Sequence, residues 1–149
     1  MRISELMSQE SVVTGIKANS KRQVLQELSK KAAEITGLSE RTIFDIILER
    51  ESLGTTGVGN GVAIPHGRVD SIKKVHGIFA KLDNAIDFES VDSKPVDLVF
   101  MLLAPEAAGA DHLKALAKVS RTVKDETTRN SIRASDDNEA IYALLNKED

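Results

Sequence analysis

The chain has 149 residues, of which 41% are hydrophobic and 29% charged, as expected for an ordinary globular protein with one domain over residues 1–149. Twenty Lys and Arg against 23 Asp and Glu give a formal net charge of −3, which offers no electrostatic reason to expect nucleic-acid binding. The absence of cysteine excludes disulfides, thiol catalysis and thiolate metal sites.

The hydropathy pattern does not indicate a membrane protein. The N-terminal residues 1–6 lack the apolar core of a signal peptide. The strongest apolar run, Leu98 to Ala104, is far shorter than the roughly 20 residues that cross a bilayer. We therefore expect a soluble, cytoplasmic protein without membrane insertion.

Two helices are predicted in the first third of the chain. Ser20 to Gln23 resembles a capping box, and Gly37 supplies a stop. Between them, apolar residues recur at helical spacing: Val24, Leu25, Leu28, Ala32 and Ile35. A second helix is predicted to begin at Ser39, to carry Ile43, Ile46 and Ile47 inward, and to end near Arg50 and Glu51.

The second half of the sequence predicts two strands followed by two helices. Val75–Leu82 and Pro95–Ala104 are short apolar segments bounded by turn residues, and the second is apolar on both alternating sets, as in a central strand. Asp111 is expected to cap a helix that buries Leu113, Leu116, Ala117, Ser120 and Val123. Asp136–Glu139 resembles a capping box for a last helix that buries Ile141, Leu144 and Leu145. The fold class is therefore α/β, a mixed sheet with helices on both faces.

The segment from Gly57 to Arg68 (GVGNGVAIPHGR) places four glycines, one Asn and one Pro around a single histidine, His66. Glycine allows a positive φ and a close approach to a ligand, and Pro65 fixes the chain before His66. Such constraint favours a functional imidazole over a structural one, because special backbone geometry gathers where side chains are presented. An imidazole can take up a proton, a metal or a phosphoryl group.

Several other chemistries lack support. The segment lacks the last glycine of the dinucleotide fingerprint, no Gly-Lys-Ser/Thr follows, and no G-x-S-x-G elbow occurs. The three histidines, His66, His76 and His112, do not pair at helical spacing, so no zinc site is indicated. By residue type alone, His112 is expected to be an exposed first-turn residue. Arg50 with Glu51 could be a solvated helix end or, for Arg50, a phosphoryl ligand. Arg68 could bind a phosphoryl group or simply lie on the surface.

Taken together, these residues carry a family resemblance. Residues 47–51 (ILERE) and 53–66 (LGTTGVGNGVAIPH) closely resemble enzyme IIA proteins of the fructose–mannitol class of the bacterial phosphotransferase system, and DLVFMLLAP at 97–105 followed by DHL at 111–113 extends the match. Many relatives read Ser-Thr where this chain has Thr55-Thr56. With no permease or carrier domain in its 149 residues, the chain is most similar to the nitrogen-regulatory branch.

The resemblance implies that His66 accepts a phosphoryl group from a histidine-containing phosphocarrier protein of the HPr or NPr type. His112 matches the family's second active-site histidine, and Arg50 matches its arginine. We expect the Nε2 atom of His66 to be the nucleophile while the other ring nitrogen donates to a backbone carbonyl. The hydroxyl of Thr55 and loop N–H groups, including those near Gly57 and Asn60, are expected around the phosphoryl oxygens, with Arg68 nearby and no metal or cofactor.

Four functions stay open at this point. The leading one is a phosphoryl carrier that regulates transporters or sensor kinases according to its phosphorylation state. The second is a sugar-specific IIA that passes the phosphoryl group to a permease IIB domain. A binding module without phosphorylation and a metal-binding regulator using His66 and His112 are the others.

Overall fold

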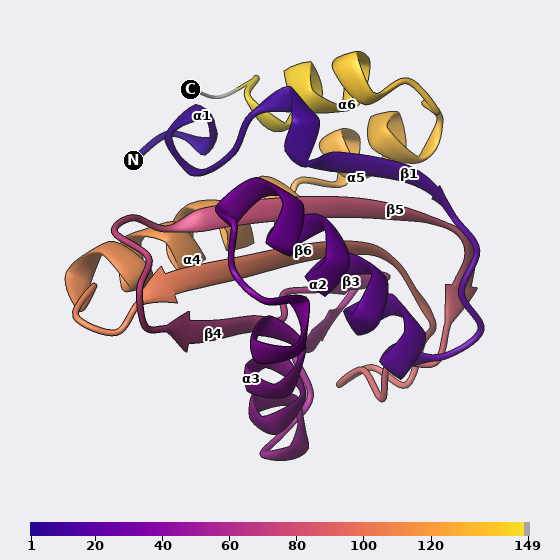
Figure 1. Ribbon diagram of the computed structural model, residues 1–149. Helices are drawn as coiled ribbons and strands as arrows, with labels where there is room; N and C mark the ends of the chain where they lie inside the picture. The colour runs from indigo at the N-terminus through magenta and orange to yellow at the C-terminus, as the bar shows by residue number, and fades with distance from the viewer. Residues whose placement is uncertain (148–149) are drawn as a thin grey trace.

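The computed structural model describes residues 1–147, and Figure 1 shows a sheet covered by helices. The six strands run in the order β1-β5-β6-β3-β2, with β4 also paired to β6. The strands are β1 (Val12–Ile16), β2 (Gly57–Gly59), β3 (Val62–Ala63), β4 (His66–Val69), β5 (His76–Ile86) and β6 (Val96–Pro105). The helices are α1 (Ile3–Leu6), the 3-10 turn η1 (Gln9–Ser11), α2 (Lys21–Thr36), α3 (Glu40–Ser52), α4 (Ala110–Lys124), α5 (Glu126–Arg133) and α6 (Asn138–Leu145).

Strand β6 is the central strand of the sheet and is covered on both faces. It pairs antiparallel with β5 and parallel with β3 and β4, so the sheet is mixed. Every side chain from Leu98 to Ala104 is at most 1% exposed. Alternate residues enter two separate cores, as expected from the two-residue period of a strand. The predicted two-sided burial of this strand is confirmed.

The two cores correspond to two layers of helices. Helices α2 and α3 pack on one face, where Leu28 and Ile47 are fully buried. Helices α1, α4, α5 and α6 supply the other core, which contains Phe100, Val119 and Ile141. Figure 1 shows α2 and α3 in front of the strands and α4 behind them. The predicted fold class, a mixed sheet with helices on both faces, is confirmed.

The first two long helices begin where the sequence predicts. Ser20 Oγ accepts the Gln23 N–H at 3.2 Å, and Gln23 Oε1 reaches back to the N–H of Asn19 rather than that of Ser20. Helix α2 ends at Gly37 with φ +77°, the left-handed geometry that glycine adopts freely. Ser39 caps α3, although Ile46 of the predicted inward set is only half-buried.

Helix α4 differs from its prediction in both its start and its buried face. Its N-cap is Gly109 with φ +50°, and the Asp111 side chain does not cap it. The buried stripe is His112, Ala115, Val119, Thr122 and Val123. Leu113, predicted to be buried, is 67% exposed. The predicted stripe is displaced by one residue over most of the helix, and one residue rotates the face by about 100° at 3.6 residues per turn.

The C-terminal part contains one more helix than predicted. Helix α5 was missed because only Ile132 of its eight residues is a buried apolar residue. The last helix is capped by Asp137, one residue later than the Asp136 start expected, and Asp137 Oδ2 accepts the N–H of Ala140 at 3.3 Å. Strand β1 and helix α1 were likewise not predicted.

The glycine-rich segment folds into the three short strands β2, β3 and β4. Between β2 and β3, Asn60 and Gly61 have φ of 59° and 76°. Arg133 of α5 secures this turn from outside, because its Nη2 donates to the Asn60 carbonyl at 2.8 Å while its guanidinium pairs with the Asp97 carboxylate. A Cβ on Gly61 would collide with that guanidinium.

We expect Gly61→Ala to lower the free energy of unfolding by about 1–3 kcal/mol, since it combines a positive φ with a steric clash. Gly54→Ala is the matched control, because Gly54 has no positive φ and a methyl group added there would meet no atom within 4 Å. Its change should stay within about 0.5 kcal/mol. Urea unfolding measures both values, and equal losses would contradict the assignment.

Candidate functional site

His66 is delivered to the site by the pairing of β3 and β4 with β6. Val62 faces Leu98 and His66 faces Leu102, so the two short strands keep one constant offset to β6. Between them Pro65 has no N–H to offer, but its carbonyl accepts the N–H of Leu102 at 2.9 Å. The segment is therefore one strand with a local interruption immediately before His66.

The interruption frees a carbonyl for the imidazole. The N–H of Ile64 turns to the carbonyl of Thr56 at 3.0 Å, and the carbonyl of Ile64 lies 2.9 Å from His66 Nδ1. A carbonyl oxygen can only accept, so Nδ1 carries the proton and the neutral ring keeps its lone pair on Nε2. This is the tautomer that the sequence predicts.

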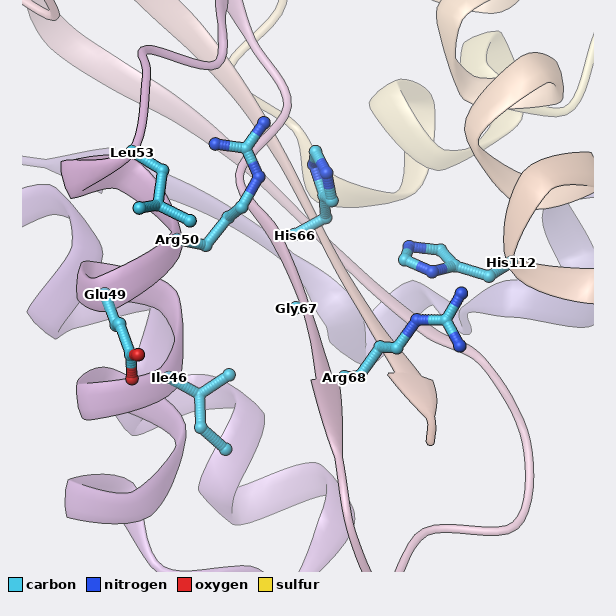
Figure 2. A pocket seen from close by; sticks show the side chains of 8 residues that line it. All are labelled: Ile46, Glu49, Arg50, Leu53, His66, Gly67, Arg68 and His112. Atoms are coloured by element: carbon cyan, nitrogen blue, oxygen red, sulfur yellow. The ribbon is translucent and has the colours of Figure 1, made fainter. Parts of the chain in front are cut away.

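A cavity of about 480 Å³ opens beside this ring, and Figure 2 shows the side chains around it. They come from α3, β4 and the first turn of α4, together with the residue that follows α3: Ile46, Glu49, Arg50, Leu53, His66, Gly67, Arg68 and His112. The structure therefore brings together four of the residues singled out in the sequence, namely His66, His112, Arg50 and Arg68. They approach from three elements that are far apart along the chain.

His112 is buried, not exposed as residue type alone suggested. It is 6% exposed, and its ring lies 5.7 Å from that of His66 between centroids, with the planes at 68°. Within residues 1–147, no group satisfies its Nε2 by hydrogen bonding. Burial, followed by electrostatic interaction with His66 and Arg68, lowers the pKa of His112 below its ordinary value. The site thus holds an imidazole whose burial favours its neutral form and whose Nε2 has no partner among the described residues.

The two arginines stand on opposite sides of His66 in Figure 2. Each is anchored to a backbone carbonyl: Arg50 Nη1 donates to Gly54 at 3.0 Å, and Arg68 Nη1 donates to Glu106 at 2.9 Å. Because each anchor uses one of the five donors of a guanidinium, the others can face a ligand. The two cations favour an anion in the cavity.

Thr55 lines a second cavity at His66. This cavity has a volume of about 270 Å³, and its lining residues are Arg50, Thr55, Thr56, Val58, Ile64, His66, Leu116 and Ser120. The hydroxyl of Thr55 already donates to the Phe88 carbonyl at 2.9 Å and accepts the N–H of Gly57 at 3.1 Å. A bond from this hydroxyl to a phosphoryl oxygen would have to replace the bond to Phe88.

Gly57 and Asn60 line neither cavity at His66. A Cβ on Gly57 would lie 2.9 Å from the Cα of Ser90, and the N–H of Asn60 donates to Asp92 Oδ2 at 3.1 Å. The N–H of Gly57 donates to the Thr55 hydroxyl and that of Asn60 to Asp92, so in this structure neither N–H is directed at a cavity beside His66. Gly57 and Asn60 contribute to the fold of the segment through their contacts with Ser90 and Asp92.

Sequence reasoning missed Glu51. Instead of a solvated helix end, its side chain is 2% exposed and pairs with Lys21 Nζ at 2.8 Å. Charged residues at a helix end are usually solvated, and the partner Lys21 is distant along the chain, so no local sequence signal pointed to it. In residues 1–147 no group of three or more His, Asp or Glu side chains could hold a metal ion. Over the same range no helix is both long and apolar enough to span a membrane.

Chemically, the site offers one lone pair on His66 Nε2, two anchored guanidinium groups and one unpaired imidazole nitrogen around an open space. Such a set suits a small tetrahedral dianion, since fixed donors around developing charge need no reorganisation.

The comparisons with known proteins agree on one family. The sequence profile described as phosphoenolpyruvate-dependent sugar phosphotransferase system, EIIA 2, matches residues 5–148. A nitrogen regulatory protein of Bradyrhizobium diazoefficiens is 56% identical over 145 residues, which cover 97% of this chain and 95% of that protein. The crystal structure of nitrogen regulatory protein IIA-Ntr from Neisseria meningitidis matches with a TM-score of 0.91 and 34% identity, covering 96% of this chain and 98% of that one.

A fructose-specific EIIABC component of Bacillus subtilis is also similar, with 32% identity over 150 residues that cover all of this chain but 24% of that protein. The profile match and the full-length relatives lead to the same conclusion: this chain belongs to the EIIA 2 family of the phosphoenolpyruvate-dependent sugar phosphotransferase system, a family of phosphotransfer components.

Proposed function

We propose that the chain accepts a phosphoryl group on His66 Nε2 from a phosphohistidine of an HPr- or NPr-type carrier protein. The observation that carries this proposal is the bond from His66 Nδ1 to the Ile64 carbonyl, 2.9 Å long, which leaves the lone pair on Nε2 of a ring that lines the cavity. A nucleophile held in one tautomer beside two cations meets the needs of phosphoryl transfer.

The transfer exchanges one bond for another of the same kind. The His66 Nε2 lone pair forms a P–N bond while the P–N bond to the carrier's histidine breaks and its electron pair returns to that ring. Arg50 and Arg68 lie on either side to stabilise the oxygens of the loose, in-line transition state. His112 Nε2, buried and without a partner among residues 1–147, can meet a phosphoryl oxygen without giving up an existing bond.

We further propose a regulatory role in nitrogen metabolism or transport, in which the phosphorylation state selects targets such as transporters or sensor kinases. The nitrogen regulatory protein of B. diazoefficiens supports this role with 56% identity over nearly its full length. The alternative is a sugar-specific IIA that serves a permease IIB domain, and the B. subtilis relative favours it at 32% identity. Phosphoryl transfer to an added fructose-type IIB domain would favour that alternative.

Intact mass spectrometry tests the central claim. After incubation with phosphoenolpyruvate, the general phosphotransferase enzyme and the carrier, we expect one acid-labile phosphoryl group on the wild-type chain and none on His66→Ala. Phosphate retained by His66→Ala would refute the assignment of the acceptor. If the folded wild-type chain takes up no phosphate while the general enzyme and the carrier are active, the protein is a binding module and not a phosphoryl carrier.

The titration of His112 gives a second test. We expect its pKa to lie below the ordinary value, to rise in part in Arg68→Gln, and to rise on phosphorylation of His66, since a dianion favours the imidazolium. Imidazole NMR signals measure each shift. His76 is the internal control, because burial and Lys74 lower its pKa and Arg68 is not among the causes. A His112 pKa that falls on phosphorylation would contradict the proposed contact.

Exposed apolar side chains around the two cavities support a carrier-docking surface. Leu53 is 81% exposed at the rim of the first cavity, Val58 is 50% exposed at the second, and Leu113 is 67% exposed beside His112. Large apolar residues so placed are typical of interaction surfaces. They supply the shallow apolar patch that a carrier protein would cover.

We expect Leu53→Ser to raise the half-saturating concentration of the carrier about tenfold with little change in the maximal rate, because truncating an interface anchor costs roughly 1–2 kcal/mol. Steady-state phosphorylation assays measure both constants. Val91→Ser is the control, since Val91 is 71% exposed but lines neither cavity at His66. A loss confined to the maximal rate would argue against docking through Leu53.

A further inference from the structure

Among residues 1–147, Glu51 is the one carboxylate that the structure buries, and the phosphotransfer chemistry does not use it. It follows Arg50 in the last turn of α3, yet it lines neither cavity at His66. Its Oε2 pairs with Lys21 Nζ at 2.8 Å and accepts the N–H of Thr56 at 3.2 Å, and its Oε1 accepts the hydroxyl of Thr56. Both oxygens are therefore engaged.

From Thr56 a series of hydrogen bonds continues to the nucleophile. The carbonyl of Thr56 accepts the N–H of Ile64 at 3.0 Å, and the carbonyl of Ile64 accepts Nδ1–H of His66 at 2.9 Å. Thr56, which bonds the Glu51 carboxylate, is thus also bonded to Ile64, whose carbonyl fixes the proton of His66 on Nδ1. Two residues connect the buried ion pair to the ring.

We propose that Glu51, paired with Lys21, is a positioning residue that fixes the tautomer and orientation of His66 through Thr56 and Ile64. The inference deepens the proposed function and rests on it. Glu51 touches neither the phosphoryl group nor the carrier; it acts by holding Thr56 where the Ile64 carbonyl is directed at Nδ1.

The chemistry of the pair explains why a charged group serves here. A buried carboxylate is costly unless cations and hydrogen bonds compensate it, so Glu51 is stable only where Lys21 and both donors of Thr56 are in place. Lys21 is itself restrained, because its Nζ lies 4.8 Å from the centroid of the Phe88 ring. The carbonyl of the same Phe88 accepts the hydroxyl of Thr55. Any displacement of the 55–56 segment thus breaks several bonds at once.

A purely structural ion pair is the competing explanation. In that case loss of the Glu51 charge would lower the stability of the whole domain but leave the His66 ring unchanged in the folded molecules. The tautomer of His66 distinguishes the two, because global stability does not determine which ring nitrogen carries the proton.

The test is Glu51→Gln, which keeps the shape but removes the charge and one acceptor. Nitrogen-15 NMR of the unphosphorylated chain, at a pH where His66 is neutral, reads the proton on each ring nitrogen. We expect Nδ1–H alone in the wild type and a mixture of tautomers in Glu51→Gln. Phosphoryl acceptance should be slower by about tenfold, the equivalent of one hydrogen bond. If Glu51→Gln does not fold, Lys21→Met replaces it with the same expectation.

Asp45→Asn is the matched control, since Asp45 is an exposed carboxylate of the same helix paired with Arg41. It should keep both the tautomer and the rate. A single Nδ1–H tautomer in folded Glu51→Gln would overturn the inference, whether its rate is normal or reduced. A wild-type chain that takes no phosphate would instead defeat the proposed function, and the tautomer comparison would still decide the role of Glu51.

Discussion

The pairing of β3 and β4 with β6 is the constraint on which the site depends. Strand β6 is buried on both faces, so its register cannot slip without moving apolar side chains out of two cores. One constant offset carries this register through the interruption at Pro65. The imidazole of His66 is consequently placed by the core of the protein, although it lies in a glycine-rich segment whose backbone would otherwise be permissive.

The interruption at Pro65 has a chemical result as well as a geometric one. The antiparallel pairing of Gly57 with Ala63 continues by one step, to Thr56 and Ile64. Here the N–H of Ile64 bonds Thr56 and its carbonyl bonds His66 Nδ1. The glycine-rich segment therefore folds back on itself as β2 and β3, and Asp92 and Arg133 hold the turn between them through the N–H and the carbonyl of Asn60. The cationic and imidazole side chains that line the first cavity come from α3, β4 and α4.

The sequence predicted what depends on local pattern, and it failed where long-range packing decides. Ser20, Gly37 and Ser39 mark helix ends through local hydrogen bonds and backbone geometry, and continuous apolarity identifies β6. The buried face of α4 depends instead on where the sheet lies, so Leu113 was expected inside and His112 outside. Glu51 could not be identified either, because its partner Lys21 is thirty positions away along the chain and a carboxylate at a helix end is usually solvated. The glycine-rich segment singled out His66, and the helix end offered Arg50 as a phosphoryl ligand, whereas the role of His112 came from the family resemblance alone. That the three side chains line one cavity depends on the fold.

The anchoring of the site bears on how phosphorylation could act as a signal. His66, Arg50 and Arg68 are each held by a backbone carbonyl, those of Ile64, Gly54 and Glu106. Groups so restrained can receive an anion with little rearrangement of the domain. A phosphoryl group would then alter the surface chiefly by adding about −1.5 to −2 charges. That charge would appear between exposed Leu53 and Leu113, inside the surface that a partner would cover. A partner with an acidic or apolar face would be disfavoured by electrostatic repulsion and by the cost of desolvating the anion, so discrimination between the two forms needs no second conformation.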